Sequence, residues 1–459
     1  MDLCANPADR PLVILAYPRV EHEQDYLYHW MPFSLLTIAG ALRTMPEIDV
    51  VIFDGNQREM AQWEALLDAE LPRALCVGLS IMTGGAQIRH ALEMARIAKR
   101  HDRCPPLVFG GPHVNVLPAQ TVKHELVDYA LAGPGQNSMP LLVDALLGKR
   151  SFDEVPGLWR CEPGTGAATL TRQNPPKTGV MATYPWDLLN VPEYVRDDPT
   201  IAPRTLNYIS SQGCVYKCQF CYELTYQRKW SAMPTGDMLG DIRWLCEQYA
   251  VSGIKFYDAD FFVNVRRAQE YCDALIDSGL NIAWAASINP NDVLRARKQN
   301  VDLIGRVAAS GCRRLLMGME SGDDRVLRDV VKKEITSAQL WDVAREIAGN
   351  GIRGAYTFIV GFPGESRAEI ERTYALIDKI RTLVPLPETR VHLFGPFPGT
   401  TLFDQAIQYG FVPPDRLEHW ADFNYYESQT PWTSGAMEQR AWGNTKLVAR
   451  TGRMKLAQR

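Results

Sequence analysis

The sequence predicts an α/β protein with two domains, a doubly wound Rossmann-like domain followed by a partial (β/α)6 barrel. Its 459 residues exceed the roughly 100 to 200 residues of a typical domain. Two separate series of short apolar runs alternate with amphipathic stretches, and this alternation is typical of a parallel sheet covered by helices. A stretch rich in Gly and Pro separates the two series.

The first series predicts a doubly wound domain over residues 1–149. An amphipathic stretch at 86–100 predicts one of its helices. The expected strands are the apolar runs 12–16, 50–53, 74–79, 107–109 and 129–132.

Residues 150–204 predict an extended linker with a hairpin, because they contain Pro156-Gly157 and Pro163-Gly164 and lack long periodicity. A second series over residues 205–400 supplies six strand-helix units, which are too few for a closed eight-unit barrel and predict an open one. Its expected strands are 206–211, 254–258, 282–287, 313–318, 354–360 and 390–395.

The last segment, 401–459, is rich in aromatic residues, and we expect it to cap the barrel mouth. Its aromatic side chains either stack on a planar substrate or pack in a core. They are Trp420, Phe423, Tyr425, Tyr426, Trp432 and Trp442.

Charge and hydropathy narrow the class of partner. The net charge is -4, and no basic stretch stands out, so we expect no nucleic-acid partner. The first ten residues lack a basic start followed by an apolar run, and no apolar run reaches the roughly 18 to 20 residues that span a bilayer. These features predict a cytoplasmic protein without a membrane partner.

Three of the ten cysteines, Cys214, Cys218 and Cys221, follow the first strand of the second series. Spacings of three and two residues let one loop wrap a 4Fe-4S cluster and leave one iron without a protein ligand. An open iron can chelate S-adenosylmethionine, which the reduced cluster then cleaves to a radical. The alternative is a zinc site, but structural zinc needs four ligands, and no Cys or His follows this loop before Cys246.

This CxxxCxxC loop, with the aromatic Phe220 before its last cysteine, resembles the loop of the radical S-adenosylmethionine superfamily. The resemblance implies a cluster held by Cys214, Cys218 and Cys221 as catalytic metal ligands, and S-adenosylmethionine as co-substrate. One departure is Gln212, which stands where related cobalamin-bearing members often have Arg.

The resemblance also implies contacts to S-adenosylmethionine at the strand ends. Glu320 would accept hydrogen bonds from the ribose, and Asp258 would contact the methionyl amino group. Ser287 and Asn289 would contact the methionyl carboxylate, while Gly361 would let the backbone approach the adenine. For each of these residues a turn or helix-cap role is the alternative.

Glycine-rich turns follow three strands of the first domain and resemble the loops of cobalamin-binding domains. Glycine permits close approach to a large flat cofactor, and hydroxyl groups can bond its nucleotide tail. A nucleotide site is the alternative, and Pro134 and Gln136 replace acidic residues common in the family. The implied cobalamin residues are Ser80, Thr83, Gly84, Gly110, Gly111, Pro112, Gly133 and Gly135.

The cobalt's lower face is predicted to lack a protein nitrogen. Some cobalamin proteins supply a His from an Asp-x-His-x-x-Gly loop, but this chain has Asn56 two residues after Asp54. A carboxamide is a poorer cobalt donor than imidazole. His113 is the competing residue, and we expect it beside the nucleotide tail.

Taken together, the resemblance implies a cobalamin-dependent radical S-adenosylmethionine methyltransferase acting through methylcobalamin. The expected substrate is a small metabolite, aromatic or heterocyclic, that is modified at an unactivated carbon. An electron donor such as flavodoxin or ferredoxin is the expected protein partner. The alternatives are an oxidative cyclase or rearrangement enzyme without net methylation, and a non-catalytic sensor.

Overall fold

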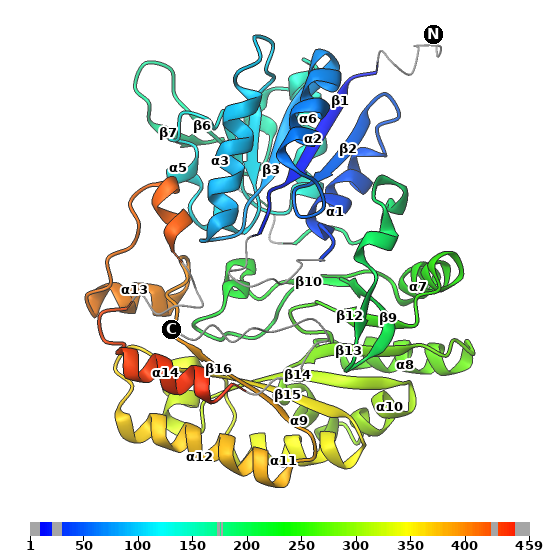
Figure 1. The fold of residues 1–459 in the computed structure, drawn as a ribbon, viewed down its shortest axis with the longest axis vertical. Helices are drawn as coiled ribbons and strands as arrows, with labels where there is room; N and C mark the ends of the chain where they lie inside the picture. The colour runs from blue at the N-terminus through cyan, green and yellow to red at the C-terminus, as the bar shows by residue number, and fades with distance from the viewer. Residues whose placement is uncertain (1–9, 21–29, 172–174, 176–177, 424–429, 446–459) are drawn as a thin grey trace. The chain divides into compact units, whose positions relative to one another are not determined.

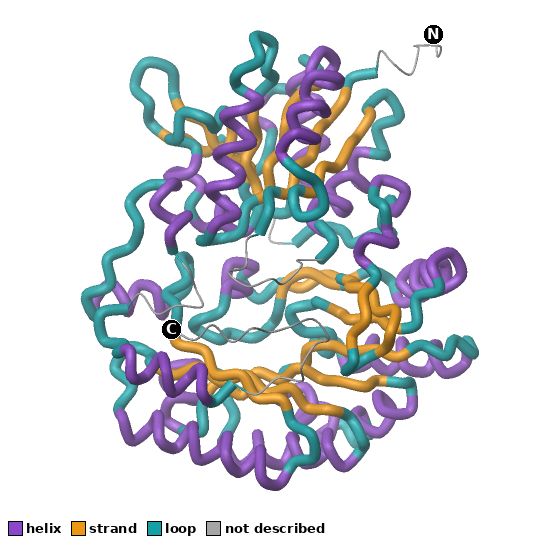
Figure 2. The backbone as a smooth tube through the Cα atoms, in the orientation of Figure 1, coloured by secondary structure: helices purple, strands orange, loops and turns teal. Residues whose placement is uncertain are grey.

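The computed structural model describes residues 10–20, 30–171, 175, 178–423 and 430–445, drawn in Figures 1 and 2. The chain divides into two compact units. Unit 1 comprises Met1–Glu193 and Pro413–Asn424, and unit 2 comprises Tyr194–Val412 and Tyr425–Arg459. Tyr425 and Tyr426 lie outside the described residues.

Unit 1 contains a seven-stranded sheet in the order β2-β1-β3-β4-β5-β6-β7, in which β1 to β5 are parallel. The strand order reverses between β1 and β3, and doubly wound sheets bind ligands beyond the carboxyl ends of strands at such a point. The predicted fold class is therefore confirmed here. The five parallel strands are β1 (Leu12–Tyr17), β2 (Asp49–Asp54), β3 (Ala74–Ser80), β4 (Leu107–Gly110) and β5 (Tyr129–Leu131).

Residues 150–204 contribute short strands to both units. The hairpin of β6 (Leu158–Cys161) and β7 (Ala168–Leu170) extends the first sheet antiparallel to β5. Strand β8 (Arg196–Asp198) pairs antiparallel with β9 (Ala202–Tyr208) of the second sheet.

Amphipathic helices bury the unit 1 sheet because each presents one apolar stripe. Helices α1 (Phe33–Leu42) and α6 (Gly135–Leu146) share a core with β1 and β3. Helices α2 (Met60–Glu70) and α3 (Ala86–Ala98) pack together, with a hydrogen bond of 3.1 Å from the Trp63 indole to the Met94 carbonyl.

Unit 2 contains a second seven-stranded sheet in the order β16-β15-β14-β13-β12-β9-β8, in which every strand but β8 is parallel. All six predicted strands are present, and the sheet is the open, partial barrel that the sequence predicts. The remaining parallel strands are β12 (Gly253–Phe256), β13 (Ala283–Ile288), β14 (Cys312–Glu320), β15 (Arg353–Val360) and β16 (Glu388–Leu393).

Helices line one face of this curved sheet, as Figures 1 and 2 show. Successive side chains of a strand point to opposite faces, so Leu315, Met317 and Met319 of β14 are buried while alternate residues are less so. The helices are α7 (Thr235–Tyr249), α8 (Val265–Asp277), α9 (Pro290–Lys298), α10 (Leu303–Ala309), α11 (Ser337–Gly349) and α12 (Arg367–Leu383).

The C-terminal segment contributes to both units. Helices α13 (Thr401–Gln408) and α14 (Gly435–Gly443) belong to unit 2, whereas the 3-10 helix η8 (Leu417–Asp422) belongs to unit 1. Trp420 and Phe423 are buried in unit 1, and Trp442 is exposed. The aromatic residues of this segment therefore occupy several different environments.

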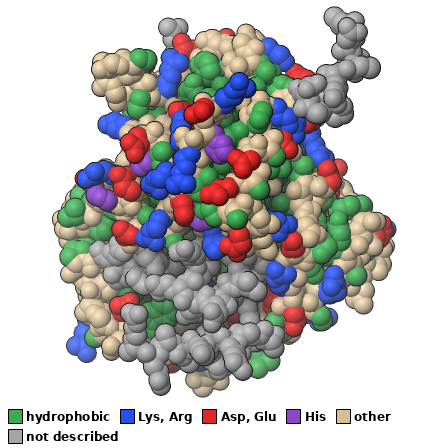
Figure 3. All heavy atoms as spheres, turned by 45° about the horizontal axis from the view of Figure 1, so that its top comes forward, with side chains coloured by type: hydrophobic (Ala, Val, Ile, Leu, Met, Phe, Trp, Pro, Cys, Tyr) green, Lys and Arg blue, Asp and Glu red, His purple; other side chains and the backbone are tan. Residues whose placement is uncertain are grey.

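No helix among the described residues has the length and apolar character needed to cross a membrane. On the face drawn in Figure 3, basic and acidic side chains are interspersed with apolar ones.

The first prediction concerns Gly111, whose backbone has φ 94° and ψ -175°, a conformation that essentially only glycine adopts. An added Cβ would lie 2.7 Å from the Ile81 carbonyl oxygen. Gly111→Ala should lower the free energy of unfolding by roughly 1–3 kcal/mol from backbone strain, with the steric clash adding to it. Gly148→Ala is the control, because Gly148 also has a positive φ, 72°, but nothing lies within 4 Å of the added atom. Equal losses in urea denaturation of the two variants would contradict this account.

Candidate functional site

The three-cysteine loop of unit 2 is closed at its base by a short hairpin. Strands β10 (Ser211–Gly213) and β11 (Trp230–Ala232) pair antiparallel, with Gly213 opposite Trp230. All three cysteines lie between these strands. The sequence motif thus becomes one loop whose two ends are held together.

Backbone hydrogen bonds attach the middle of this loop to two other segments. The Gln219 amide donates to the Val331 carbonyl at 3.0 Å, and the Leu402 amide donates to the Gln219 carbonyl at 3.2 Å. Phe220 packs against Phe362, with ring centroids 6.2 Å apart. The predicted aromatic residue therefore touches the turn that follows β15.

Asp258 fixes the chain just before the loop. Its carboxylate accepts hydrogen bonds from the Ser210 amide at 2.7 Å, the Ser210 hydroxyl at 2.6 Å and the Ser211 hydroxyl. Arg267 donates to the same Ser210 hydroxyl at 2.9 Å. Asp258 is buried, and both of its oxygens are engaged in this network. The network gives Asp258 a clear role in positioning the loop.

Three thiols on one loop suit a 4Fe-4S cluster, which takes one thiolate on each of three irons. Burial raises the pKa of Cys214 to about 12 and the pKa of Cys221 well above its ordinary value. Burial also raises the pKa of Cys218, although the nearby Lys333 ammonium opposes that rise. Thiolates in this place therefore need cationic partners such as iron.

The geometry of these side chains does not resemble a site for one ion. Within the described ranges, no three His, Cys, Asp or Glu side chains converge closely enough to hold a single metal ion. A cubane has a different requirement, because each thiolate binds a different iron.

Glu320 forms a buried ion pair that the sequence analysis did not identify. The Lys333 ammonium donates to Glu320 Oε1 at 2.8 Å, and both side chains are buried. Burial works to lower the pKa of Lys333, but Glu320, Cys218 and Cys221 overcome this and raise it. Lys333 thus brings a positive charge close to the cysteines. No sequence pattern distinguishes it from its neighbour Lys332.

Gly318 makes room for this ion pair. An added Cβ there would lie 2.1 Å from Glu320 Oε1 and 3.2 Å from Lys333 Nζ. Glu320 itself has φ 63°, which is uncommon for a residue with a side chain and marks local strain. The glycine of the Gly-Met-Glu sequence is therefore required because a side chain there would collide with Glu320 and Lys333.

A second acidic group that the sequence did not indicate lies beside the loop. Asp260 and Asp292 are buried next to each other, and the hydroxyl of Tyr216, a loop residue, donates to Asp292 Oδ1 at 2.5 Å. Burial, together with repulsion from Asp260, raises the pKa of Asp292 well above its ordinary value, and burial also raises the pKa of Asp260. Arg295 donates to Asp292 Oδ1 at 2.6 Å. The two carboxyl groups also hydrogen-bond each other, and apart from that contact neither Oδ2 atom has a hydrogen-bond partner among the described residues.

Ser287 and Asn289, the two residues predicted as ligands at the end of β13, have different hydrogen-bond partners. Asn289 Oδ1 accepts the Asn291 amide at 3.0 Å and so caps α9. Ser287 lies on β13, partly buried, and its carbonyl accepts the Phe261 amide. The Asn289 side-chain oxygen therefore has the helix-cap role that was the alternative to a contact with S-adenosylmethionine.

Gly361 lies in a turn with φ 83°, a conformation that favours glycine. Its amide donates to Glu365 Oε2 at 2.7 Å, and its carbonyl accepts the Trp432 indole at 2.9 Å. Burial raises the pKa of Glu365 to about 7. Trp432 therefore packs over this turn.

In unit 1, the predicted cobalamin loops lie at the carboxyl ends of β3, β4 and β5, the edge where this fold binds ligands. Ser80 ends β3, and Gly84 has φ 75° in the following turn. After β4, Gly110 and Gly111 precede Pro112, the first residue of α4 (Pro112–Val116). After β5, Gly133 has φ 95° and Gly135 opens α6, where an added Cβ would lie 2.6 Å from Ile38.

Several buried polar atoms at this edge have no hydrogen-bond partner among the described residues. They are Thr83 Oγ1, Ser138 Oγ and both ring nitrogens of His113. Leaving a buried polar group unsatisfied costs about 1–3 kcal/mol, so these atoms fit a site for a polar ligand. Asn56 differs, because its side chain accepts the Val20 amide at 2.8 Å and donates to Asp54 at 2.8 Å.

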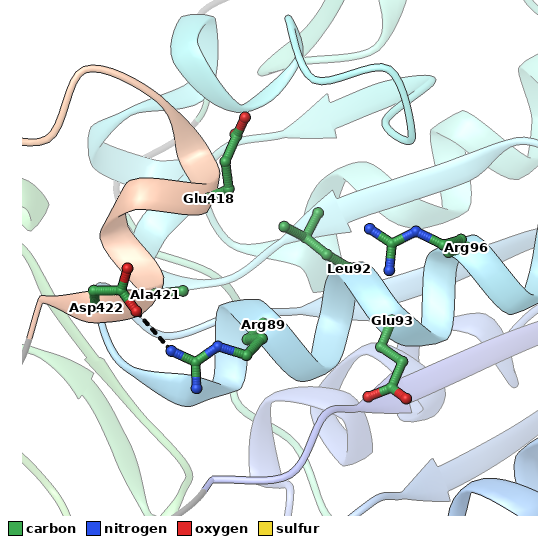
Figure 4. Close-up of a pocket in the computed structure, with 7 residues that line it drawn as sticks. All are labelled: Arg89, Leu92, Glu93, Arg96, Glu418, Ala421 and Asp422. Atoms are coloured by element: carbon green, nitrogen blue, oxygen red, sulfur yellow. Dashed lines mark hydrogen bonds and ion pairs between the residues drawn. The ribbon is translucent and has the colours of Figure 1, made fainter.

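A shallow groove of about 350 Å³ lies between α3 and η8 (Figure 4). An ion pair of 2.7 Å between Arg89 and Asp422 crosses one end of it. Its lining mixes both signs of charge. The lining residues are Arg89, Leu92, Glu93, Arg96, Glu418, Ala421 and Asp422.

Two protein-family models match this chain, one within each of its two units. The model of the radical SAM superfamily matches residues 208–377, and the model of the B12 binding domain matches residues 25–143. The first match contains the cysteine loop, Glu320 and Gly361. The second contains the glycine-rich turns.

Two relatives show the range of chemistry among similar chains. An uncharacterized methyltransferase of Pyrococcus horikoshii is 27% identical over 82% of this chain and 78% of its own length. The anaerobic magnesium-protoporphyrin IX monomethyl ester cyclase of Rubrivivax gelatinosus is 24% identical over 88% of this chain and 70% of its own.

Two solved structures share the fold. The radical S-adenosylmethionine methyltransferase TsrM from Kitasatospora setae, with cobalamin and a [4Fe-4S] cluster bound, matches with a TM-score of 0.67 and 18% identity over 88% of this chain and 80% of its own. The cobalamin-dependent S-adenosylmethionine radical enzyme OxsB, with aqua-cobalamin and S-adenosylmethionine bound, matches with a TM-score of 0.68 and 19% identity over 81% of this chain and 52% of its own.

The second prediction concerns the buried ion pair. Lys333→Met leaves the Glu320 carboxylate buried without its partner, so it should lower the free energy of unfolding by about 3–5 kcal/mol. The double variant Lys333→Met with Glu320→Gln removes both charges and should recover much of that loss in urea denaturation. Additive losses in the two single variants and the double variant would show that the two side chains do not interact.

Proposed function

Because this chain belongs to the cobalamin-binding radical S-adenosylmethionine enzymes, we propose that it is a C-methyltransferase that methylates an unactivated carbon of a small metabolite. The observation that carries the proposal is the three-cysteine loop beside the Glu320–Lys333 pair, in a chain that also has a B12 binding domain. Similarity to methyltransferases supports the choice of reaction.

The cofactors supply the reactive chemistry. When bound, the cluster with S-adenosylmethionine supplies a 5'-deoxyadenosyl radical, and cobalamin supplies the methyl group. Cys214, Cys218 and Cys221 would hold the cluster. The hairpin, the Asp258 network and the Gln219 hydrogen bonds fix the loop that carries them, which is the positioning that such a reaction requires.

The methionyl ammonium is best accommodated by Asp260 and Asp292. We favour this pair over Asp258, because both Asp258 oxygens already accept hydrogen bonds from Ser210 and Ser211. The two carboxyl groups are buried and hydrogen-bond each other, and a cation beside them would relieve the repulsion that, together with burial, raises the pKa of Asp292. An ammonium group there would favour the ionised form of both carboxyl groups.

The other residues predicted from the sequence to contact S-adenosylmethionine or cobalamin have the same roles in this proposal. Glu320 would accept the ribose hydroxyls and Gly361 would lie against the adenine, with Phe220 packed on the adjoining turn. Ser287 and the side-chain nitrogen Nδ2 of Asn289 would meet the methionyl carboxylate, because the backbone amide of Asn289 donates to Asp260. Cobalamin would bind at the carboxyl edge of the unit 1 sheet, where the Ser80 and Thr83 hydroxyls lie.

A second candidate function is oxidative cyclisation or rearrangement without net methylation. The observation in its favour is similarity to magnesium-protoporphyrin cyclases over most of the chain. Either reaction needs a small-molecule substrate and an electron donor such as flavodoxin or ferredoxin.

The third prediction separates the two reactions by product mass. The reconstituted enzyme is incubated anaerobically with reductant, candidate metabolites and S-adenosylmethionine carrying a trideuterated methyl group. A methyltransferase should give a product in which one hydrogen is replaced by a CD3 group, and Cys218→Ala should give none. A product that has lost hydrogen and carries no label would contradict methylation and support cyclisation.

A further inference from the structure

Unit 1 is completed by a piece of chain distant from it in sequence. The residues Pro413–Asn424, here called the strap, belong to unit 1, while the residues on either side belong to unit 2. The strap contains η8 and buries Leu417 and Trp420, each only 1% exposed. It is therefore a packed part of the domain.

The strap contacts the turns that follow β3 and β4. The Gly85 amide donates to the Trp420 carbonyl at 3.0 Å. The Trp420 indole meets the His113 ring edge to face, with centroids 5.8 Å apart. His113 in turn donates its backbone amide to the Ile81 carbonyl at 3.1 Å. One strap residue thus touches both glycine-rich turns.

The exposed side of the strap contributes little to its attachment to unit 1. Its contact with α3 there is the Arg89–Asp422 pair, whose side chains are 59% and 76% exposed (Figure 4). Exposed ion pairs contribute little to stability, typically about 0–1 kcal/mol. The buried residues Leu417 and Trp420 supply apolar packing, and Gln120 Nε2 donates a hydrogen bond of 3.2 Å to the Pro414 carbonyl.

The buried side of the strap also carries polar atoms that lack partners. Trp420 Nε1, both ring nitrogens of His113 and Thr83 Oγ1 are buried and have no hydrogen-bond partner among the described residues. Burial lowers the pKa of His113 to about 3, so its ring is neutral and has one N–H donor and one acceptor. An indole nitrogen can only donate. The set therefore contains three donors, and a ligand rich in acceptor oxygens would satisfy them.

We propose that Trp420 of the strap and His113 are cobalamin-binding residues that hold the nucleotide tail of the cofactor. The tail contains a phosphodiester and a ribose, whose oxygens accept hydrogen bonds from the Trp420 indole, the His113 ring and the Thr83 hydroxyl. Trp420 thereby selects corrinoids that carry a nucleotide. The proposal depends on cobalamin binding in unit 1 and is independent of whether the reaction is methylation.

Comparison of two corrinoids tests this assignment. Trp420→Phe keeps an aromatic ring against His113 and removes the N–H donor together with the five-membered ring that carries it. Equilibrium dialysis should show roughly tenfold weaker binding of hydroxocobalamin, the effect of one lost hydrogen bond. Binding of cobinamide, which lacks the nucleotide, should be unchanged. Trp442→Phe is the matched control, because Trp442 is exposed and should affect neither ligand.

A second variant guards against misfolding of the strap. Thr83→Val is nearly isosteric, lies outside the strap and should weaken hydroxocobalamin selectively in the same way. Equal weakening of both corrinoids by Trp420→Phe, or no change in either, would overturn the proposal. A wild-type protein that binds cobinamide and hydroxocobalamin equally would also overturn it, without contradicting the proposed reaction.

Discussion

The placement of three thiols on one loop next to a buried ion pair is the constraint on which the site in unit 2 depends. The cysteines lie where burial raises their pKa values, so their thiolates require positive charge nearby. The chain supplies one such charge in Lys333, itself held by Glu320 at 2.8 Å. The lack of a side chain at Gly318 leaves the space that this pair occupies. The ion pair thus accounts for the glycine at this position of β14.

Unit 1 follows a different principle, because its ligand edge depends on hydrogen bonding. Glycines at the ends of the strands leave room for close approach of the proposed cofactor, and buried hydroxyl, imidazole and indole groups there have no hydrogen-bond partner among the described residues. The strap, which is distant in sequence, packs against the turns at this edge. Both units contain a parallel sheet, and in such a sheet the side chains that follow the carboxyl ends of different strands lie at one edge.

The sequence predicts most of the fold and part of the site. Apolar runs identify all eleven parallel strands, because strands of a sheet covered by helices are rich in apolar residues even where they are only partly buried. The cysteine spacing identifies the loop, because ligand geometry restricts it. Lys333, Asp260 and Asp292 escape sequence reasoning, because long-range packing alone brings them to the loop. The role of Trp420 in unit 1 is hidden for the same reason, since the segments it joins are distant in sequence.

The central claim is that Cys214, Cys218 and Cys221 hold a cluster with one iron open to S-adenosylmethionine. Electron paramagnetic resonance of the anaerobically reconstituted, reduced protein tests it most directly. We expect a cluster signal whose g values shift when S-adenosylmethionine is added, and which disappears in each of the three Cys→Ala variants but persists in Cys246→Ala. A signal that S-adenosylmethionine leaves unchanged, or a full cluster in any of the three variants, would contradict the account.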